Sequence, residues 1–238
     1  MRRAAAVLLA GAAAATGCGG SPPAPRTATI TVLAAASLTE AFDDLVPAAH
    51  ARYSFAGSQQ LVAQVTAGAP ADVVATADAG SMAQLVQAGL VDPPRDFARN
   101  RLAIAVEPGN PRRVQGLADL ARPDLKVVLA DPSVPAGRYA RQILDRAGVT
   151  VRPISLELDV KAVAAKVAAG EADAAIVYAT DVGRAGSVAI PDDANVVATY
   201  PVAVVKATTH RAEAQAFVDR LLGPAGRAVL AARGFLAP

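Results

Sequence analysis

The 238-residue sequence has little of what metal centres and many enzymes need, with one cysteine and two histidines. His50 and His210 are far apart in the chain, and neither has the spacing of a metal-ligand pair. A Gly-rich phosphate loop and a G-x-S-x-G nucleophile motif are also missing. The lone thiol, Cys18, excludes an internal disulfide. The net charge of only +2 is too small to attract nucleic acid electrostatically. We therefore expect no nucleic-acid partner and no protein-bound metal cation.

What the N-terminus does have is the pattern of an export signal. Residues 1–17 combine two arginines with an apolar segment that is too short to span a membrane. Cys18 follows Ala15-Thr16-Gly17 and resembles a bacterial lipobox, although Ala15 stands where leucine is more common. The resemblance implies cleavage before Cys18 and attachment of diacylglycerol to its sulfur. The alternative is an incidental cysteine near an ordinary cleavage site. Residues 18–27 then predict a flexible, proline-broken tether.

From residue 28 onward, apolar runs typical of strands alternate with stripes typical of amphipathic helices. This order predicts an α/β fold with mainly parallel sheets and crossover helices. The chain is long enough for two lobes. We expect strands at Ile30–Ala34, Tyr53–Phe55, Asp72–Ala77, Leu102–Val106, Val127–Ala130, Leu156–Leu158, Ala174–Tyr178, Val196–Thr199 and Val202–Val205. We expect helices at Leu38–Val46, from Leu61, and at Ser81–Leu90, Ala136–Ala147, Val160–Ala168, Ala212–Leu222 and Pro224–Ala232.

Several helices are predicted to begin directly after a strand, beside small or hydroxyl residues. Ser37 and Glu40 have the spacing of a capping box, as do Ser81 and Gln84, and Asp159 stands at a cap position. A helix N-terminus carries unpaired N–H groups and the positive end of the helix dipole, which suit a bound anion. Neutral donors at such places are Ser37, Ser58, the amides around Ala136 and Val160, and the hydroxyl of Tyr178.

Six motifs, in order, carry a resemblance to a known family: AAASLTEAF, SFAGSQQL, GAPADVVATAD, DPSVPAGRYA, GEADAAIVYATD and YPVAVV. Together they closely resemble the molybdate-binding proteins of bacterial ABC importers, from about Thr29 to Phe235. The resemblance implies a two-lobed periplasmic-binding-protein fold of type II, with helices flanking each sheet and the ligand in the cleft between the lobes. It further implies that the cleft closes on a dehydrated tetrahedral oxyanion and that no cofactor is needed.

The resemblance also implies the ligand-binding residues, which are Ser37, Ser58, Ala136, Val160 and Tyr178. Additional backbone donors are expected from Ala35, Gly57 or Gln59. Each position also has an ordinary structural interpretation: the serines could cap their helices, Ala136 and Val160 could be first-turn residues, and Tyr178 could be a core aromatic. The joint pattern favours a binding site.

The family resemblance and the chain path predict the domain organisation. Residues 28–105 are expected to form the first part of lobe 1, residues 106–200 lobe 2, and residues 201–238 the return to lobe 1. The crossings are then near Val106 and Tyr200–Val202. Two departures from the family pattern are the short segment between Leu45 and Phe55, and Gln59-Gln60 where a second hydroxyl is common.

These observations predict a monomeric, exported receptor that is lipid-anchored on the outer face of the cytoplasmic membrane. It would capture molybdate or tungstate and deliver it to an ABC permease, without being an enzyme. A receptor for another small oxyanion such as sulfate is the alternative within this class. From other classes, a secreted hydrolase using Ser37 or Ser58 would need a histidine or lysine within reach. A purely adhesive lipoprotein would bind no small ligand.

Overall fold

The computed structural model describes residues 28–45 and 50–238. The expected export signal and Cys18 lie outside this part of the chain. The strands are β1 (Ile30–Ala35), β2 (Ala51–Ala56), β3 (Val73–Ala75), β4 (Arg95–Val106), β5 (Val127–Ala130), β6 (Ser155–Glu157), β7 (Ala174–Tyr178), β8 (Gly186–Ala189) and β9 (Val197–Val204).

The α-helices are α1 (Thr39–Leu45), α2 (Ser58–Thr66), α3 (Ala79–Gln87), α4 (Pro135–Arg146), α5 (Val160–Ala168), α6 (Arg211–Leu222) and α7 (Pro224–Ala232). Three short 3-10 helices complete the described elements: η1 (Ala36–Leu38), η3 (Leu117–Ala121) and η4 (Ala179–Asp181). Within the described ranges no helix is both long and apolar enough to cross a membrane.

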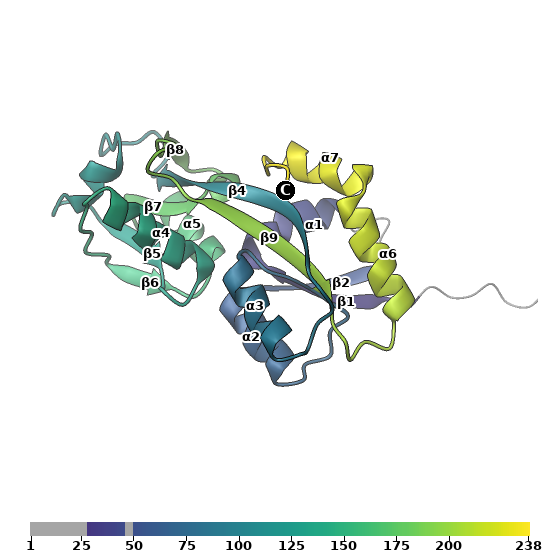
Figure 1. Ribbon diagram of the computed structural model, residues 1–238. Coiled ribbons are helices and arrows are strands. Elements are labelled where there is room, and N and C mark those ends of the chain that lie inside the picture. The colour runs from purple at the N-terminus through teal and green to yellow at the C-terminus, as the bar shows by residue number, and fades with distance from the viewer. Residues whose placement is uncertain (1–27, 46–49) are drawn as a thin grey trace, which may run out of the picture.

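The strands follow the order β2-β1-β3-β9-β4-β7-β5-β6, with β8 paired to β4. Strand β1 is parallel to β2 and β3 at one end, and β5 is parallel to β6 and β7 at the other. We call the end with β1–β3, α1–α3, α6 and α7 lobe 1, and the end with β5–β7, α4 and α5 lobe 2 (Figure 1). The long antiparallel strands β4 and β9 connect them. The expected two-lobed α/β fold with a mainly parallel sheet in each lobe is confirmed.

Apolar side chains cover both faces of the lobe 1 sheet, because successive residues of a strand pack into two different apolar clusters. Val32 in β1 packs in the cluster that contains Phe42 of α1 and Phe217 of α6. Leu33, the next residue, packs in a second cluster with Leu61 of α2 and residues of α3. Successive side chains of a strand point to opposite faces, so one apolar run serves both clusters.

The sequence predicted most elements within a few residues, with four corrections. Strand β4 begins at Arg95 rather than Leu102. The two strands expected at 196–199 and 202–205 are one strand, β9, that continues through Pro201. Strand β8 was not expected. Helix α3 is capped by Asp78, whose Oδ1 accepts from Ser81 N at 2.9 Å, so the box of Ser81 with Gln84 was wrong.

Candidate functional site

A small cavity lies between the two lobes, where β1, β2, β3 and β7 end and α2, α4 and α5 begin. Its volume is about 10 Å³, which is room for about one water-sized sphere. Residues from both lobes line it: Ala35, Ala36, Ser37, Ala56, Gly57, Ser58 and Ala77 from lobe 1, and Val134, Pro135, Ala136, Val160 and Tyr178 from lobe 2. All of these residues are uncharged.

All five residues that the family resemblance assigned to a ligand meet at this cavity: Ser37, Ser58, Ala136, Val160 and Tyr178. They come from four different strand-to-helix connections and the end of β7. Ala35 and Gly57 also line the cavity, whereas Gln59 is not among its lining residues. The Gln59 Nε2 instead donates to Leu158 O across the cleft, at 2.8 Å.

Helices α4 and α5 direct backbone donors at the cavity. Pro135 occupies the first position of α4 and has no N–H, so Ala136 supplies the first free amide of that helix. Val160 is the first residue of α5, and the Asp159 side chain caps the helix by accepting from Ala162 N at 2.8 Å. The cap predicted at Asp159 is confirmed. The cap leaves the Val160 amide without an intrahelical acceptor.

Helix α2 contributes in the same way, with one difference. Its N-cap is Gly57, whose N–H donates to Gln60 Oε1 at 3.0 Å. The Gly57 amide is thus already used inside the helix cap, which leaves the amide of Ser58, the first helical residue, free of an intrahelical acceptor. The positive ends of α2, α4 and α5 therefore all lie beside the cavity.

The Ser58 hydroxyl is buried, and its Oγ accepts a hydrogen bond from Ala77 N at 3.0 Å. Because a hydroxyl carries a single proton and that proton is not used in this bond, Ser58 can donate it to a ligand.

The capping role expected for Ser37 was wrong. Ser37 lies inside η1, the preceding N-cap residue is Ala35, and that end of the 3-10 helix has no side-chain cap. The Ser37 Oγ lies 3.0 Å from the hydroxyl of buried Tyr200. The Glu40 carboxylate, the second half of the expected box, is bound to Lys161 instead. A long-range tyrosine contact cannot be read from local spacing, which explains the error.

Tyr178 reaches the cavity from the end of β7 and is 1% exposed. Its hydroxyl lies 3.5 Å from Ala77 O in lobe 1, at the outer limit of a hydrogen bond. Burial raises the pKa of Tyr178 well above its usual value. The phenol therefore keeps its proton, which it donates to Ala77 O here and can donate to a ligand instead.

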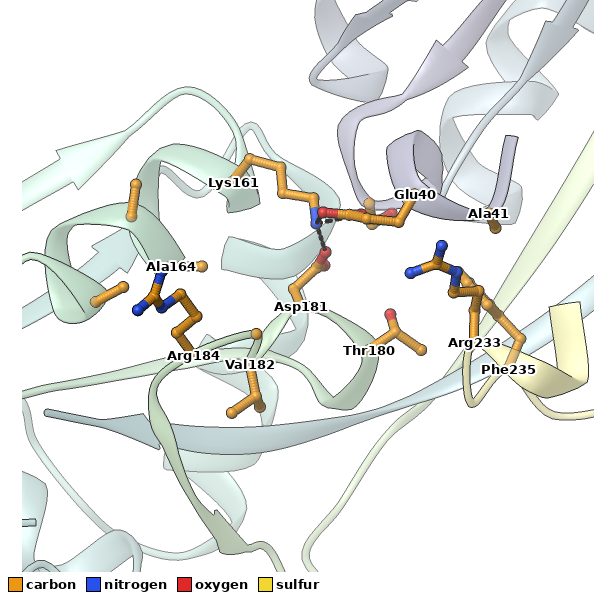
Figure 2. Close-up of a pocket in the computed structure, with 14 residues that line it drawn as sticks. Glu40, Ala41, Lys161, Ala164, Thr180, Asp181, Val182, Arg184, Arg233 and Phe235 are labelled. Carbon is orange, nitrogen blue, oxygen red and sulfur yellow. Dashed lines mark hydrogen bonds and ion pairs between the residues drawn. The ribbon is translucent and has the colours of Figure 1, made fainter. Parts of the chain in front are cut away.

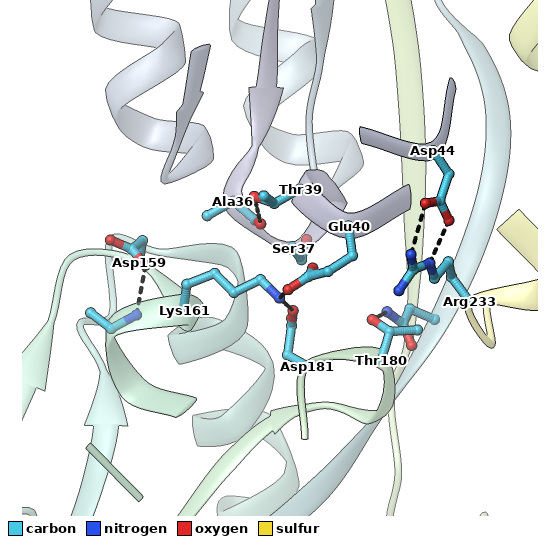
Figure 3. A network of polar contacts seen from close by, with 12 residues as sticks. Ala36, Ser37, Thr39, Glu40, Asp44, Asp159, Lys161, Thr180, Asp181 and Arg233 are labelled. Atoms are coloured by element: carbon cyan, nitrogen blue, oxygen red, sulfur yellow. Dashed lines mark hydrogen bonds and ion pairs between the residues drawn. The ribbon is translucent and has the colours of Figure 1, made fainter. Parts of the chain in front are cut away.

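Charged residues surround the cavity without lining it. On one side, Lys161 of α5 places its Nζ 2.6 Å from Glu40 Oε2 of α1 and 2.7 Å from Asp181 Oδ1 (Figure 3). On another side, Arg138 of α4 pairs with Asp78 of lobe 1. The ion pairs of Lys161 with Glu40 and of Arg138 with Asp78, together with the contact of Gln59 with Leu158, join the lobes around the cavity.

Asp181 is a carboxyl group near the cleft whose side chain is fully buried. Burial raises the pKa of Asp181 to about 6, and the lowering by Lys161 is smaller. Its contact with Lys161 is a close charge pair, although neither oxygen has a well-aligned hydrogen bond. Burial lowers the pKa of Lys161, but Asp181 and Glu40 together raise it by more, so the lysine stays charged.

A larger groove of about 460 Å³ lies next to the small cavity and shares Ser37 with it. Lys161, Glu40 and Asp181 lie at this groove, with Arg184 on the lobe 2 side and Arg233 and Phe235 on the lobe 1 side (Figure 2). Charged side chains and alanine side chains line this groove together. The smaller cavity is the better candidate for a ligand because three helix N-termini and three hydroxyls converge there.

Comparison with known proteins agrees with this architecture. Residues 30–236 match the family model described as bacterial extracellular solute-binding protein. The chain belongs to this family. A relative from Mycobacterium tuberculosis, named molybdate-binding protein ModA, is 40% identical over 98% of this chain and 95% of its own length.

Among solved structures of solute-binding proteins, the periplasmic molybdate-binding protein of Azotobacter vinelandii has a TM-score of 0.77 at 21% identity, covering 88% of this chain and 99% of that one. The sulfate-binding protein SubI of M. tuberculosis has a TM-score of 0.76, also at 21% identity, covering 87% and 86%. At this level of identity the two structures support the fold alone.

Proposed function

We propose that this protein is an extracytoplasmic receptor that captures molybdate or tungstate and delivers it to an ABC permease. The observation that carries the proposal is the small interlobe cavity, which is lined by neutral donors from two lobes. Its small size and its uncharged donors favour a small inorganic ion over sugars, amino acids and peptides as the ligand class. The name of the M. tuberculosis relative supports molybdate in particular.

The chemistry of the cavity suits a fully deprotonated tetrahedral oxyanion. Such an ion must lose its water, and fixed N–H and O–H donors can replace the lost hydrogen bonds without rearranging. Hydrogen phosphate brings its own O–H, which would find no acceptor among these donors and is therefore disfavoured. No cofactor enters this account, because the bound ion is the cargo.

A receptor for sulfate is the alternative within the same class, because sulfate is also a tetrahedral dianion without a proton. The structural similarity to a sulfate-binding protein reflects the shared fold and does not favour sulfate over molybdate. Cavity size would have to separate the two ions.

Calorimetric titration of the purified protein with molybdate, tungstate, sulfate and phosphate tests the proposal. We expect clear heats of binding with molybdate and tungstate, with much weaker binding of sulfate and phosphate. Binding of sulfate without binding of molybdate or tungstate would contradict it.

A hydrolytic role for the buried serines is the alternative from another class. The hydrogen-bond partner of Ser37 is Tyr200 and that of Ser58 is Ala77 N, and neither partner can act as the general base that a serine nucleophile needs. The family of the chain consists of solute-binding proteins. We expect no labelling by a fluorophosphonate probe, and stoichiometric labelling of either serine would contradict the receptor role.

We further propose that the lobes move about β4 and β9. The pairing of β4 changes from β9 to β7 between Arg101 and Leu102, and β9 pairs with β3 of lobe 1 from Val202 onward. This pairing supports lobe ranges close to 28–105, 106–200 and 201–238, with the first crossing a few residues before Val106.

Anchoring through a lipid on Cys18 also belongs to the proposal, together with an exported location and a monomeric state. The lipobox-like sequence supports the anchor. Incorporation of labelled palmitate into the protein, with loss of the label in Cys18→Ser, is the expected result. Equal labelling of the variant, or no labelling of either form, would contradict the anchor.

A further inference from the structure

Tyr200 lies in β9, directly behind the candidate site, and is fully buried. Its ring is held by edge-to-face contacts with Tyr178 and Phe235, at centroid distances of 5.7 and 5.4 Å. Its hydroxyl lies 3.0 Å from Ser37 Oγ. Tyr200 is not among the residues that line the cavity, so it can affect a ligand only through its neighbours.

Ser58 illustrates how a hydrogen-bond donor to the serine oxygen leaves the serine proton available for the cavity. The donor to its Oγ is a backbone N–H, that of Ala77, so the direction of this hydrogen bond is certain. One lone pair of Ser58 is thereby occupied and its own proton remains for the cavity. The protein thus makes Ser58 a donor toward the ligand.

In the described part of the chain Ser37 has no such backbone donor, and the direction of its hydrogen bond with Tyr200 decides its role. If Ser37 donated to Tyr200, its lone pairs would face the cavity and repel an anion. If Tyr200 donates, the Ser37 proton is free for the ligand. Burial, together with the nearby charge of Asp181, raises the pKa of Tyr200 well above its usual value, and hydrogen bonding with Ser37, Asn100 and Tyr178 only partly offsets this rise. Tyr200 therefore carries a proton to donate throughout the neutral pH range.

We propose that Tyr200 is a positioning residue that donates its hydroxyl proton to Ser37 Oγ and so fixes Ser37 as a hydrogen-bond donor to the ligand. Tyr200 acts for Ser37 as the Ala77 amide acts for Ser58. The inference rests on the proposed oxyanion function and assigns part of its specificity to a residue outside the cavity. An oxyanion without a proton benefits from this arrangement, whereas one with an O–H meets a serine that directs its proton at the ligand and has one of its two lone pairs occupied by Tyr200.

The variant Tyr200→Phe removes this donor while it keeps the ring. Ser37 can then rotate and accept a hydrogen bond from a protonated ligand. We expect the affinity for molybdate to fall roughly tenfold, the equivalent of about one hydrogen bond. We expect the ratio of molybdate affinity to hydrogen phosphate affinity to fall by a larger factor than the molybdate affinity does. The reason is that Ser37 can then accept a hydrogen bond from phosphate, whose own affinity should rise.

A double-mutant cycle separates this role from a purely structural one. Affinities for molybdate, tungstate and phosphate are measured by calorimetry for the unaltered protein, Tyr200→Phe, Ser37→Ala and the double variant. Since Tyr200 acts through Ser37, adding Tyr200→Phe to Ser37→Ala should change the molybdate affinity less than about twofold. Tyr53→Phe is the matched control, because the buried Tyr53 hydroxyl, in lobe 1, has no hydrogen-bond partner among the described residues. This control should bind molybdate with unchanged affinity.

Two results would overturn the inference. Unchanged affinity and selectivity in Tyr200→Phe would show that the bond with Ser37 does not matter. Equal losses from Tyr200→Phe with and without the Ser37 hydroxyl would show an indirect effect on the fold. Either result, with normal molybdate binding by the unaltered protein, would leave the proposed function intact. No binding of any oxyanion by the unaltered protein would overturn both.

Discussion

Two buried serines and a buried tyrosine supply the side-chain donors of the candidate site. Ser37 and Ser58 each have a protein partner behind the hydroxyl, and burial raises the pKa of the protonated Tyr178 hydroxyl still further. Placing these hydroxyls away from water costs free energy unless they find an acceptor. A ligand whose oxygens are all acceptors offsets this cost, because each hydroxyl can donate to one of them. Uncharged residues therefore suffice to bind an anion.

Loss of one of these hydroxyls should weaken binding without unfolding the protein. We expect Ser37→Ala and Tyr178→Phe each to reduce the binding free energy for molybdate by about 1 to 3 kcal/mol, because one anion oxygen loses its partner. Calorimetry measures this change. Ser54→Ala, at an exposed position of β2, is the control. Affinity that is unchanged in both site variants would show that the ligand lies elsewhere.

Asp181 should make the stability of the protein depend on pH. Its pKa is raised from 3.8 to about 6, which corresponds to about 3 kcal/mol between its two protonation states. Because the folded protein binds the proton more tightly than the unfolded chain, this contribution is complete below pH 3.8 and is lost as pH rises through 6. At pH 7 to 8 the buried charge therefore opposes folding.

Melting temperatures of the unaltered protein and Asp181→Asn, measured between pH 4 and 8, test this expectation. The variant should be the more stable form at pH 8, and its advantage should shrink steadily toward pH 4. A constant difference across this range would mean that Asp181 does not titrate there.

At the scale of secondary-structure elements, the local sequence was sufficient to predict those helices and strands whose ends are marked by a capping residue, a proline or the end of an apolar run. Helix α4 begins at a proline, α5 has its Asp159 cap, and β7 is a short apolar run that ends at Tyr178. Strand β9 was harder because Pro201 lacks an N–H and normally interrupts a ladder. The strand continues because its pairing with β4 is irregular between Asp96 and Ala98, where the missing donor is tolerated.

The candidate site was predictable for a different reason. The five proposed ligand-binding residues were expected from a family resemblance, and the structure brings them to one cavity. Contacts between distant segments left no local signal, so the partnership of Ser37 with Tyr200, 163 residues later in the chain, was missed. The same holds for Lys161 and Glu40, whose pairing depends on how the lobes meet.

The start of α2 should be sensitive to any added side chain. A Cβ on Gly57 would lie 2.5 Å from the carbonyl oxygen of Leu158, which belongs to the opposite lobe. The Gly57 φ of −60° suits any residue, so the backbone itself is not strained. We expect Gly57→Ala to hinder approach of the lobes and to lower molybdate affinity, measured by calorimetry, by tenfold or more.

Gly116→Ala is the matched control, because a Cβ there meets open space. Both variants should melt within a few degrees of the unaltered protein when no ligand is added. Normal affinity in Gly57→Ala would contradict the close approach of α2 to Leu158 in the bound state.

At the scale of the whole molecule, the polar contacts between the lobes should slow the release of the ligand. Glu40 is half exposed and binds Lys161 across the cleft, while Lys161 keeps Asp181 as a second partner within lobe 2. Removing the Glu40 charge therefore breaks the interlobe pair without leaving Asp181 unpaired. An ion pair of this exposure contributes up to about 1 kcal/mol.

We expect Glu40→Gln to release molybdate up to about fivefold faster, with little change in the association rate. Stopped-flow fluorescence with a dye on the cleft rim measures both rates. Asp43→Asn, an exposed change on the same helix, should have no effect. The effect of Glu40→Gln should shrink at high salt, and a rate that equals that of Asp43→Asn at low salt would exclude a role for this pair.

The central claim is that one tetrahedral oxyanion binds in the small cavity between the lobes. The most direct test is a crystal structure of the tungstate complex with anomalous scattering from tungsten. We expect one strong anomalous peak, with oxygen atoms at about 2.7 to 3.2 Å from the hydroxyls of Ser37, Ser58 and Tyr178 and from the amides of Ala136 and Val160. A peak elsewhere on the protein, with this cavity empty, would contradict the account.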